Sequence, residues 1–257
     1  MCEFCIQHGT GKKWYLEIKN YAEKLAASQG REEFIKDFFK NYERNYKRST
    51  QKTDIARKIP FIREYAESKI ENYFSQKHAG QVISLEDAIS ICSIPGRVSV
   101  IDCPCQKYLF NRYEKKCILF GTTANIVENL PNLDTYDMDF EDAAELLKST
   151  ESKGQVHTVW TFISPYIGAI CNCNQRKCLL FHLKNKYPFA DIMRKGHEIA
   201  VVDSNICTGC GNCQKICQFN AVIIKVRKAE INDNCYGCGL CRNFCPLDAI
   251  QLVPYRI

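Results

Sequence analysis

The chain carries the stretch CTGCGNCQKIC at residues 207–217 and a second one, CYGCGLCRNFC, at residues 235–245. In each stretch four cysteines follow the spacing C-x2-C-x2-C-x3-C, and an apolar run comes next, at residues 221–224 and 249–252. Repetition of a cysteine loop, a short helix and a strand predicts one small unit built from two similar halves. Gaps of two residues let a chain wrap a compact inorganic group, so that three thiolates converge on it. The repeat therefore predicts a metal-binding module over residues 199–257.

This pattern, with Pro246 directly after the last cysteine, resembles the bacterial, clostridial-type two-[4Fe–4S] ferredoxins. In that family three cysteines of one run bind one cluster, and the fourth ligand comes from the other run. The resemblance implies a first cluster held by Cys207, Cys210, Cys213 and Cys245, and a second held by Cys235, Cys238, Cys241 and Cys217. It covers only the last quarter of the chain. Gln218 departs from the family, which usually has proline there, but the change removes no ligand.

Zinc is the alternative metal, because paired C-x2-C motifs also build zinc sites. Zinc sites rarely use two interlocked runs of four cysteines with three residues before the last one. Glycines at 209, 211, 237 and 239 stand where a side chain would crowd a cluster or forbid the turn. We therefore favour two iron–sulfur clusters over zinc.

Nine of the 17 cysteines lie outside this module (17 − 8 = 9). Cys92 falls in a helical apolar run and is predicted to be a core residue. Six lie in tight groups in the middle of the chain, and we predict that they include the ligands of at least one further centre: Cys103, Cys105, Cys117, Cys171, Cys173 and Cys178. The two C-x-C pairs each follow a predicted buried strand and precede a helix. A third [4Fe–4S] cluster is favoured over Zn, and without a metal these residues would be buried free thiols or a redox-active disulfide.

The N-terminal pair Cys2 and Cys5, with His8 nearby, is also a candidate for metal ligation. These residues could complete the middle site, hold a further centre of their own, or form a small zinc site. The spacing alone leaves all three arrangements open.

The predicted fold class is α+β, in three parts. Apolar residues at helical spacing predict a helical region over residues 1–80. Residues 81–198 predict an α+β cysteine-rich domain, with strands near 97–101, 117–120 and 156–163 and helices near 85–92 and 179–186. The ferredoxin module follows at 199–257. Residues 101–105, 154–157 and 170–173 resemble uncharacterised cysteine-rich, ferredoxin-tailed proteins of anaerobes, a likeness that names no activity.

Composition indicates a globular chain, with 46% hydrophobic and 25% charged residues. The N-terminus has no signal-peptide pattern, and the absence of a long apolar run predicts no membrane span. Closely spaced cysteines in such a chain are typical of metal ligands in a cytoplasmic, low-oxygen setting. The net charge of +6 counts cysteines as neutral. Clusters held by thiolates would offset that charge, so it does not indicate nucleic acid as a partner.

These features predict an electron-transfer protein, which relays single electrons between a partner oxidoreductase and the middle centre. No nucleotide-binding motif accompanies the cysteines, and no catalytic residue is predicted. A reductase is the alternative, with a substrate-binding cluster in the middle domain fed by the ferredoxin module. A metal-stabilised protein that binds nucleic acid is a third interpretation. We expect an electron carrier or electron-transfer subunit rather than a stand-alone enzyme.

Overall fold

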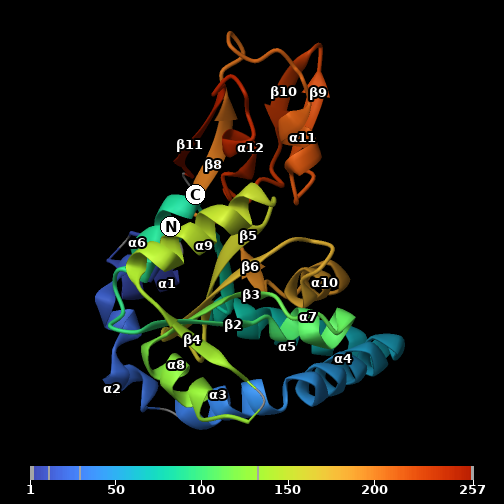
Figure 1. Cartoon of the computed structure of the whole chain (residues 1–257). Helices are drawn as coiled ribbons and strands as arrows, with labels where there is room; N and C mark the ends of the chain where they lie inside the picture. The colour runs from blue at the N-terminus through green and yellow to red at the C-terminus, as the bar shows by residue number, and fades with distance from the viewer. Residues whose placement is uncertain (1–2, 11, 29, 132, 256–257) are drawn as a thin grey trace.

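A seven-stranded sheet forms the centre of the computed structural model, which describes residues 3–10, 12–28, 30–131 and 133–255 (Figure 1). Its strands run in the order β4-β2-β3-β6-β5-β1-β7, and all neighbours are antiparallel except β1 and β7. The strands are β1 (Gly80–Ile83), β2 (Val98–Asp102), β3 (Lys115–Phe120), β4 (Thr135–Met138), β5 (Val156–Thr161), β6 (Ile167–Cys173) and β7 (Met193–Arg194). Helices and strands are mixed along the chain, so the predicted α+β class is confirmed.

Both faces of the sheet are covered, so side chains on both faces of its central strands are buried. Trp160 and Ala169 point into a thiol-side core, which also contains buried cysteines of the middle region. Their neighbours Val159 and Ile170 point into the opposite core, because successive side chains of a strand alternate between faces. Two separate cores therefore share one sheet.

Helices cover each face of the sheet. The longer ones are α3 (Arg31–Lys40), α4 (Tyr42–Lys58), α5 (Pro60–Gln76), α6 (Leu85–Cys92), α7 (Pro104–Phe110), α8 (Gly121–Glu128), α9 (Phe140–Ser152) and α10 (Leu179–Lys186). The opposite core packs under α6 and α9, and the thiol-side core under α3 and α8. Asp139 caps α9 by accepting a hydrogen bond from the Asp142 backbone N–H at 2.8 Å, as its position before two acidic residues predicts. In the part of the chain that the structure describes, no helix is long and apolar enough to cross a membrane.

The segment before α3 differs from the continuous helix that its apolar spacing suggests. It consists of α1 (Glu3–Gly9), two short 3-10 turns, η1 (Trp14–Leu16) and η2 (Ile18–Tyr21), and one turn of α2 (Glu23–Ala26). Tertiary hydrogen bonds account for the difference: Trp14 Nε1 donates to Gln81 Oε1 at 2.5 Å, and the Tyr15 hydroxyl donates to Asp87 at 2.9 Å. Burial of these large rings outweighs local helix propensity.

The N-terminal helices pack on the sheet and share its cores. Ile35 and Phe39 of α3 are buried with Trp160 in the thiol-side core, and Trp14 is buried in the opposite core. The predicted boundary between residues 80 and 81 falls inside β1. The division into these two domains stays a prediction.

The C-terminal module stands on one end of the sheet, above α6 and α9 (Figure 1). It consists of β8 (Glu198–Val202), α11 (Asn212–Ile216), β9 (Val222–Lys225), β10 (Lys228–Ile231), α12 (Leu240–Asn243) and β11 (Ile250–Pro254). Strands β9 and β10 pair, and β8 pairs with β11, which gives the two similar halves that the repeat predicts. The Asn243 side chain donates to Glu151 of α9 at 2.6 Å, which ties the module to the body of the protein.

Close packing of β1 against β5 makes Gly80 a sensitive position. A Cβ atom at residue 80 would lie 2.5 Å from the ring of Trp160, its cross-strand partner. We expect Gly80→Ala to lower the free energy of unfolding by about 1–3 kcal/mol, because the crowded ring must shift. Gly96→Ala is the control, since nothing lies within 4 Å of the added atom. Thermal unfolding of the two variants measures the difference, and equal midpoints would contradict this account of the packing.

Candidate functional site: the ferredoxin module and the buried thiols

The eight cysteines of the C-terminal module surround two small cavities, each of about 20 Å³. The outer cavity is lined by Cys207, Cys210, Cys213 and Cys245. The inner cavity is lined by Cys217, Cys235, Cys238 and Cys241. The fourth cysteine of each run thus lies with the first three of the other, in the same two groups that the ferredoxin resemblance implies.

Two glycines allow the cysteine loops to close around these cavities. Gly209 and Gly237 have φ angles of +71° and +68°, a region that residues with a side chain rarely adopt. A Cβ atom at Gly209 would lie 2.3 Å from the Arg227 carbonyl oxygen, and one at Gly237 would lie 2.0 Å from the Glu198 carbonyl oxygen. Only glycine fits both loops.

The chemistry of the cavity walls fits an iron–sulfur cluster. Backbone N–H groups donate to ligand sulfurs, from Ala229 to Cys207 at 3.4 Å and from Ala221 to Cys217 at 3.3 Å. Such bonds favour the thiolate form. Burial acts against it and raises the pKa of Cys241 to about 12, and a positive charge in the cavity would lower that pKa again. A cationic iron–sulfur core between the four sulfurs of each cavity would supply that charge.

Comparison with known families agrees with this geometry. Residues 200–223 match the 4Fe-4S binding domain, and residues 213–256 match the LdpA Fe-S cluster-binding domain. The C-terminal region is a ferredoxin-like, 4Fe–4S cluster-binding module. No match was found among curated proteins or among solved structures.

The six middle cysteines come together on the thiol-side face of the sheet, from several different places in the chain. Cys103 precedes α7 and Cys105 lies in its first turn. Cys117 of β3 lies directly opposite Cys171 of β6. Cys173 ends β6, and Cys178 precedes α10. The Cys171–Cys173 pair thus lies within its strand, rather than after it as the pattern suggested, and still reaches the same side.

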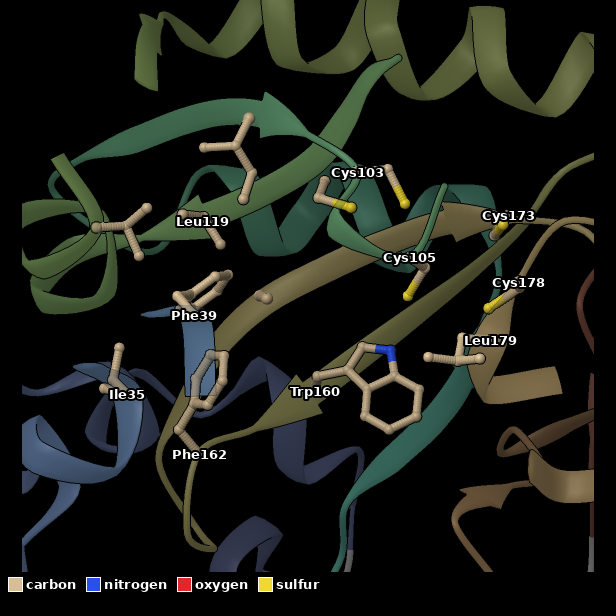
Figure 2. Close-up of a cluster of buried hydrophobic side chains, with 14 of the residues drawn as sticks. Ile35, Phe39, Cys103, Cys105, Leu119, Trp160, Phe162, Cys173, Cys178 and Leu179 are labelled. Carbon is tan, nitrogen blue, oxygen red and sulfur yellow. The ribbon is translucent and has the colours of Figure 1, made fainter. Parts of the chain in front are cut away.

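Contacts between thiols link all six residues. Neighbouring thiols shift the pKa values of all but the first in the order Cys171, Cys117, Cys103, Cys105, Cys178 and Cys173. We call these six cysteines the thiol group. Figure 2 shows its labelled members gathered at one end of the sheet, beside Trp160 and Leu179. No disulfide joins any of the cysteines that the structure describes.

The thiol group favours negative charge at two of its members. Hydrogen bonds from Cys105 and Cys117 lower the pKa of Cys103, and one from Cys178 lowers the pKa of Cys173. A buried cation lies beside them: Lys116 Nζ is 3.8 Å from Cys173 Sγ and 3.1 Å from a Glu114 carboxylate oxygen. Burial alone would lower the pKa of the Lys116 ammonium. Negative charge on the nearby Cys173 and Cys103 sulfurs, together with the Glu114 carboxylate, outweighs this effect, so the pKa is raised.

The sequence reasoning missed Lys116 and Tyr42, two polar residues whose side chains lie beside this group. The Tyr42 hydroxyl lies 2.8 Å from Cys105 Sγ, and burial raises its pKa well above the usual value, so it stays protonated. A lysine inside an otherwise buried strand is a signal that could have revealed Lys116. Tyr42 lies on a helix far away in the sequence and gives no such signal.

The N-terminal pair is placed differently from the six middle cysteines. Cys5 is buried in the opposite core, and its Sγ lies 3.6 Å from His197 Nε2. The structure does not bring Cys5 to the thiol group, and Cys2 lies outside the described residues. Cys92 is buried in the same core, as predicted.

Within the described ranges, no group of three or more His, Cys, Asp or Glu residues has the arrangement of a site for one metal ion.

The inner cavity of the module lies against the thiol-side core. Its residues Cys238, Leu240 and Tyr236 pack against the buried cluster that contains Cys173 and Cys178. The Tyr236 ring stacks on Phe219 with centroids 4.2 Å apart. Phe219 in turn lies 5.6 Å from Phe181 of α10, the helix that begins after Cys178. Aromatic packing therefore joins the two cysteine sites.

Gln218, the departure from the ferredoxin pattern, makes a second link at this junction. Its side-chain oxygen accepts a hydrogen bond from the Gln175 N–H at 3.2 Å, and its amide donates to the Gly154 carbonyl at 3.3 Å. Gln175 belongs to the loop between Cys173 and Cys178. Proline could make neither bond, so the substitution suits a module that is attached to a larger protein.

We expect Gln218→Ala to loosen this junction without removing iron. The Gln175 amide loses its acceptor, so hydrogen–deuterium exchange should become faster at residues 174–178. Gln214→Ala, on the exposed side of α11, is the matched control and should leave the exchange unchanged. Unchanged exchange in the Gln218 variant would show that the bridge contributes nothing to the contact.

Proposed function

We propose that this chain is an electron-transfer protein with three centres in series. Two [4Fe–4S] clusters occupy the outer and inner cavities of the module, and the thiol group holds a third. Each such cluster gains or loses one electron at a time, over a potential range of roughly −700 to +450 mV. One observation carries the proposal: the inner cavity packs through Tyr236 and Phe219 onto the core that contains the linked thiols.

The ligands follow from the cavities and from the thiol group. We assign Cys207, Cys210, Cys213 and Cys245 to the outer cluster, and Cys217, Cys235, Cys238 and Cys241 to the inner one. The six middle thiols are more than the four that one cube needs, so two of them act as hydrogen-bonding neighbours. Cys103 and Cys173, whose thiolates are favoured, are the first candidates for ligands of the third centre.

Packing at the junction supports transfer between the sites. Leu240 is 1% exposed and Phe181 2%, so water is kept from the space between the inner cavity and the thiol group. Low polarity there reduces the rearrangement that accompanies movement of a charge. The chain itself thus provides an apolar connection from which water is excluded.

The outer cavity supports docking of a redox partner. Cys210 is exposed at its edge, and Leu247, which lines the cavity, is 45% exposed. Ile206 beside it is 46% exposed. An apolar rim around an exposed ligand suits transient contact with an oxidoreductase that gives or takes single electrons.

The test of the third centre is the iron content of anaerobically purified protein. We expect about 12 irons per chain, because each [4Fe–4S] cluster holds four. Cys103→Ser and Cys173→Ser should each lower this by about four and leave the EPR signals of the C-terminal module in place. Cys92→Ser, a change to a buried cysteine away from both sites, is the control. Unchanged iron in both middle variants would refute the third centre.

Lys116 should set the potential of that centre. Reduction adds negative charge, which a buried ammonium a few ångströms away stabilises by about 2–4 kcal/mol at an effective dielectric constant near 20. We expect Lys116→Met to lower the third potential by on the order of 100 mV, which corresponds to that energy for one electron. Lys115→Met, an exposed neighbour, is the matched control. Redox titration followed by EPR measures both, and equal shifts would contradict a specific role for Lys116.

A reductase is the second candidate function. It is favoured by a cavity that borders the thiol group on the side away from the module, which could bring a substrate to the third centre.

A further inference from the structure

A cavity of about 510 Å³ opens between α3, α4, α5 and α10. Its wall is mainly apolar and rich in aromatic rings, which include Phe38, Tyr42, Tyr46, Phe74 and Tyr187. Size and lining are typical of sites for small organic molecules. Neither the ferredoxin module nor the thiol group needs this space for its own ligands.

Most polar side chains of the cavity wall already have hydrogen-bond partners. The hydroxyls of Ser49, Thr50 and Thr53 each donate to a backbone carbonyl one turn earlier in α4, at 2.6 to 3.0 Å. The amide of Asn45 donates to the Asp37 carboxylate at 2.6 Å. A ligand therefore meets an effectively apolar surface with one acidic edge. This excludes phosphate-bearing ligands such as nicotinamide or flavin nucleotides, which need donors and positive charge.

The cavity touches the thiol group at two points. Tyr42 lines it with its ring, and the hydroxyl of the same residue contacts Cys105 at 2.8 Å. Leu179 also lines the cavity and directly follows Cys178 in the chain. A molecule in this cavity is separated from the thiols by single side chains, close enough to exchange electrons with a centre held there.

We propose that the cavity binds a quinone that carries an apolar substituent, and that the quinone accepts electrons from the third centre. The inference rests on the proposed function, because the electrons arrive through the ferredoxin module. A flat ring stacks on aromatic walls and needs few polar partners. A quinone also accepts electrons one at a time, as a chain of one-electron centres delivers them.

The reaction balances with the groups named. One quinone takes up two electrons and two protons and becomes the hydroquinone, as both carbonyl oxygens become hydroxyls. The electrons come singly from the protein, and an external one-electron donor at the outer cavity replaces them. The protons come from water at the open side of the cavity.

Binding is tested first, on oxidised protein, so that the result does not depend on electron transfer. Isothermal titration with 2-methyl-1,4-naphthoquinone should give a saturable site with one quinone per chain. Ile70→Trp fills the cavity from α5 and should weaken binding at least about tenfold. Ile55→Trp adds the same bulk to the exposed side of α4, outside the cavity, and should leave binding unchanged. Leu183→Trp repeats the block from α10 in case Ile70→Trp fails to fold, as judged by its iron content.

Electron transfer is tested next, with protein that is reduced anaerobically and freed of excess reductant. Mixing with the quinone should reoxidise the wild-type clusters, and the Cys103→Ser variant should bind the quinone equally but react at least about tenfold more slowly. The quinone site is overturned if the wild type does not bind the quinone, or if Ile70→Trp and Leu183→Trp bind it as tightly as the wild type does. Either result leaves the proposed electron transfer between the three centres untouched. Full binding with equal reaction rates in the Cys103 variant overturns the route through the third centre.

Discussion

Any negative charge on a buried cysteine sulfur must be stabilised, and several features of this protein serve that requirement. Burial disfavours a charged sulfur, and here cysteines are buried both in the module and under the sheet. The protein answers with backbone N–H donors at Cys207 and Cys217, and with a buried ammonium at Lys116. A cationic inorganic core would complete the balance in the module. The aromatic junction serves the same end at the inner cavity, since it packs that cavity against the thiol-side core.

Attachment of the module to the sheet turns two cysteine sites into one system. An independent ferredoxin would present both of its cavities to solvent and to its partners. Here the inner cavity faces the core of the body, while the outer cavity keeps an exposed cysteine and an apolar rim. This asymmetry gives the proposed relay a direction in space, from the surface inward. Gln218 marks the change, because it replaces a loop residue of the ferredoxin pattern with a hydrogen-bonding bridge to the body.

The N-terminal helices show where sequence periodicity was a poor guide. Trp14 and Tyr15 recur at helical spacing with later apolar residues, yet they lie in a 3-10 turn, held by bonds to Gln81 and Asp87. Residues about seventy positions away in the chain thus decide the local backbone. The same N-terminal region forms most of the wall of the apolar cavity and supplies Tyr42. Tyr42 reaches the cavity and Cys105 only through tertiary packing, which no local sequence pattern indicates.

Local sequence was enough to predict the ferredoxin-like module and the α+β class. Cysteine spacing, glycine turns and strand composition act over short distances along the chain, so they can be read from it. The three-dimensional fold was needed to show that Cys103, Cys117, Cys171 and Cys178 form one linked group while Cys5 lies across the sheet. It was also needed to find Lys116 and Tyr42 beside that group. The pairing of β3 with β6 and the contact of α4 with the end of α10 bring these residues together, and such long-range contacts are set by the free energy of the whole fold.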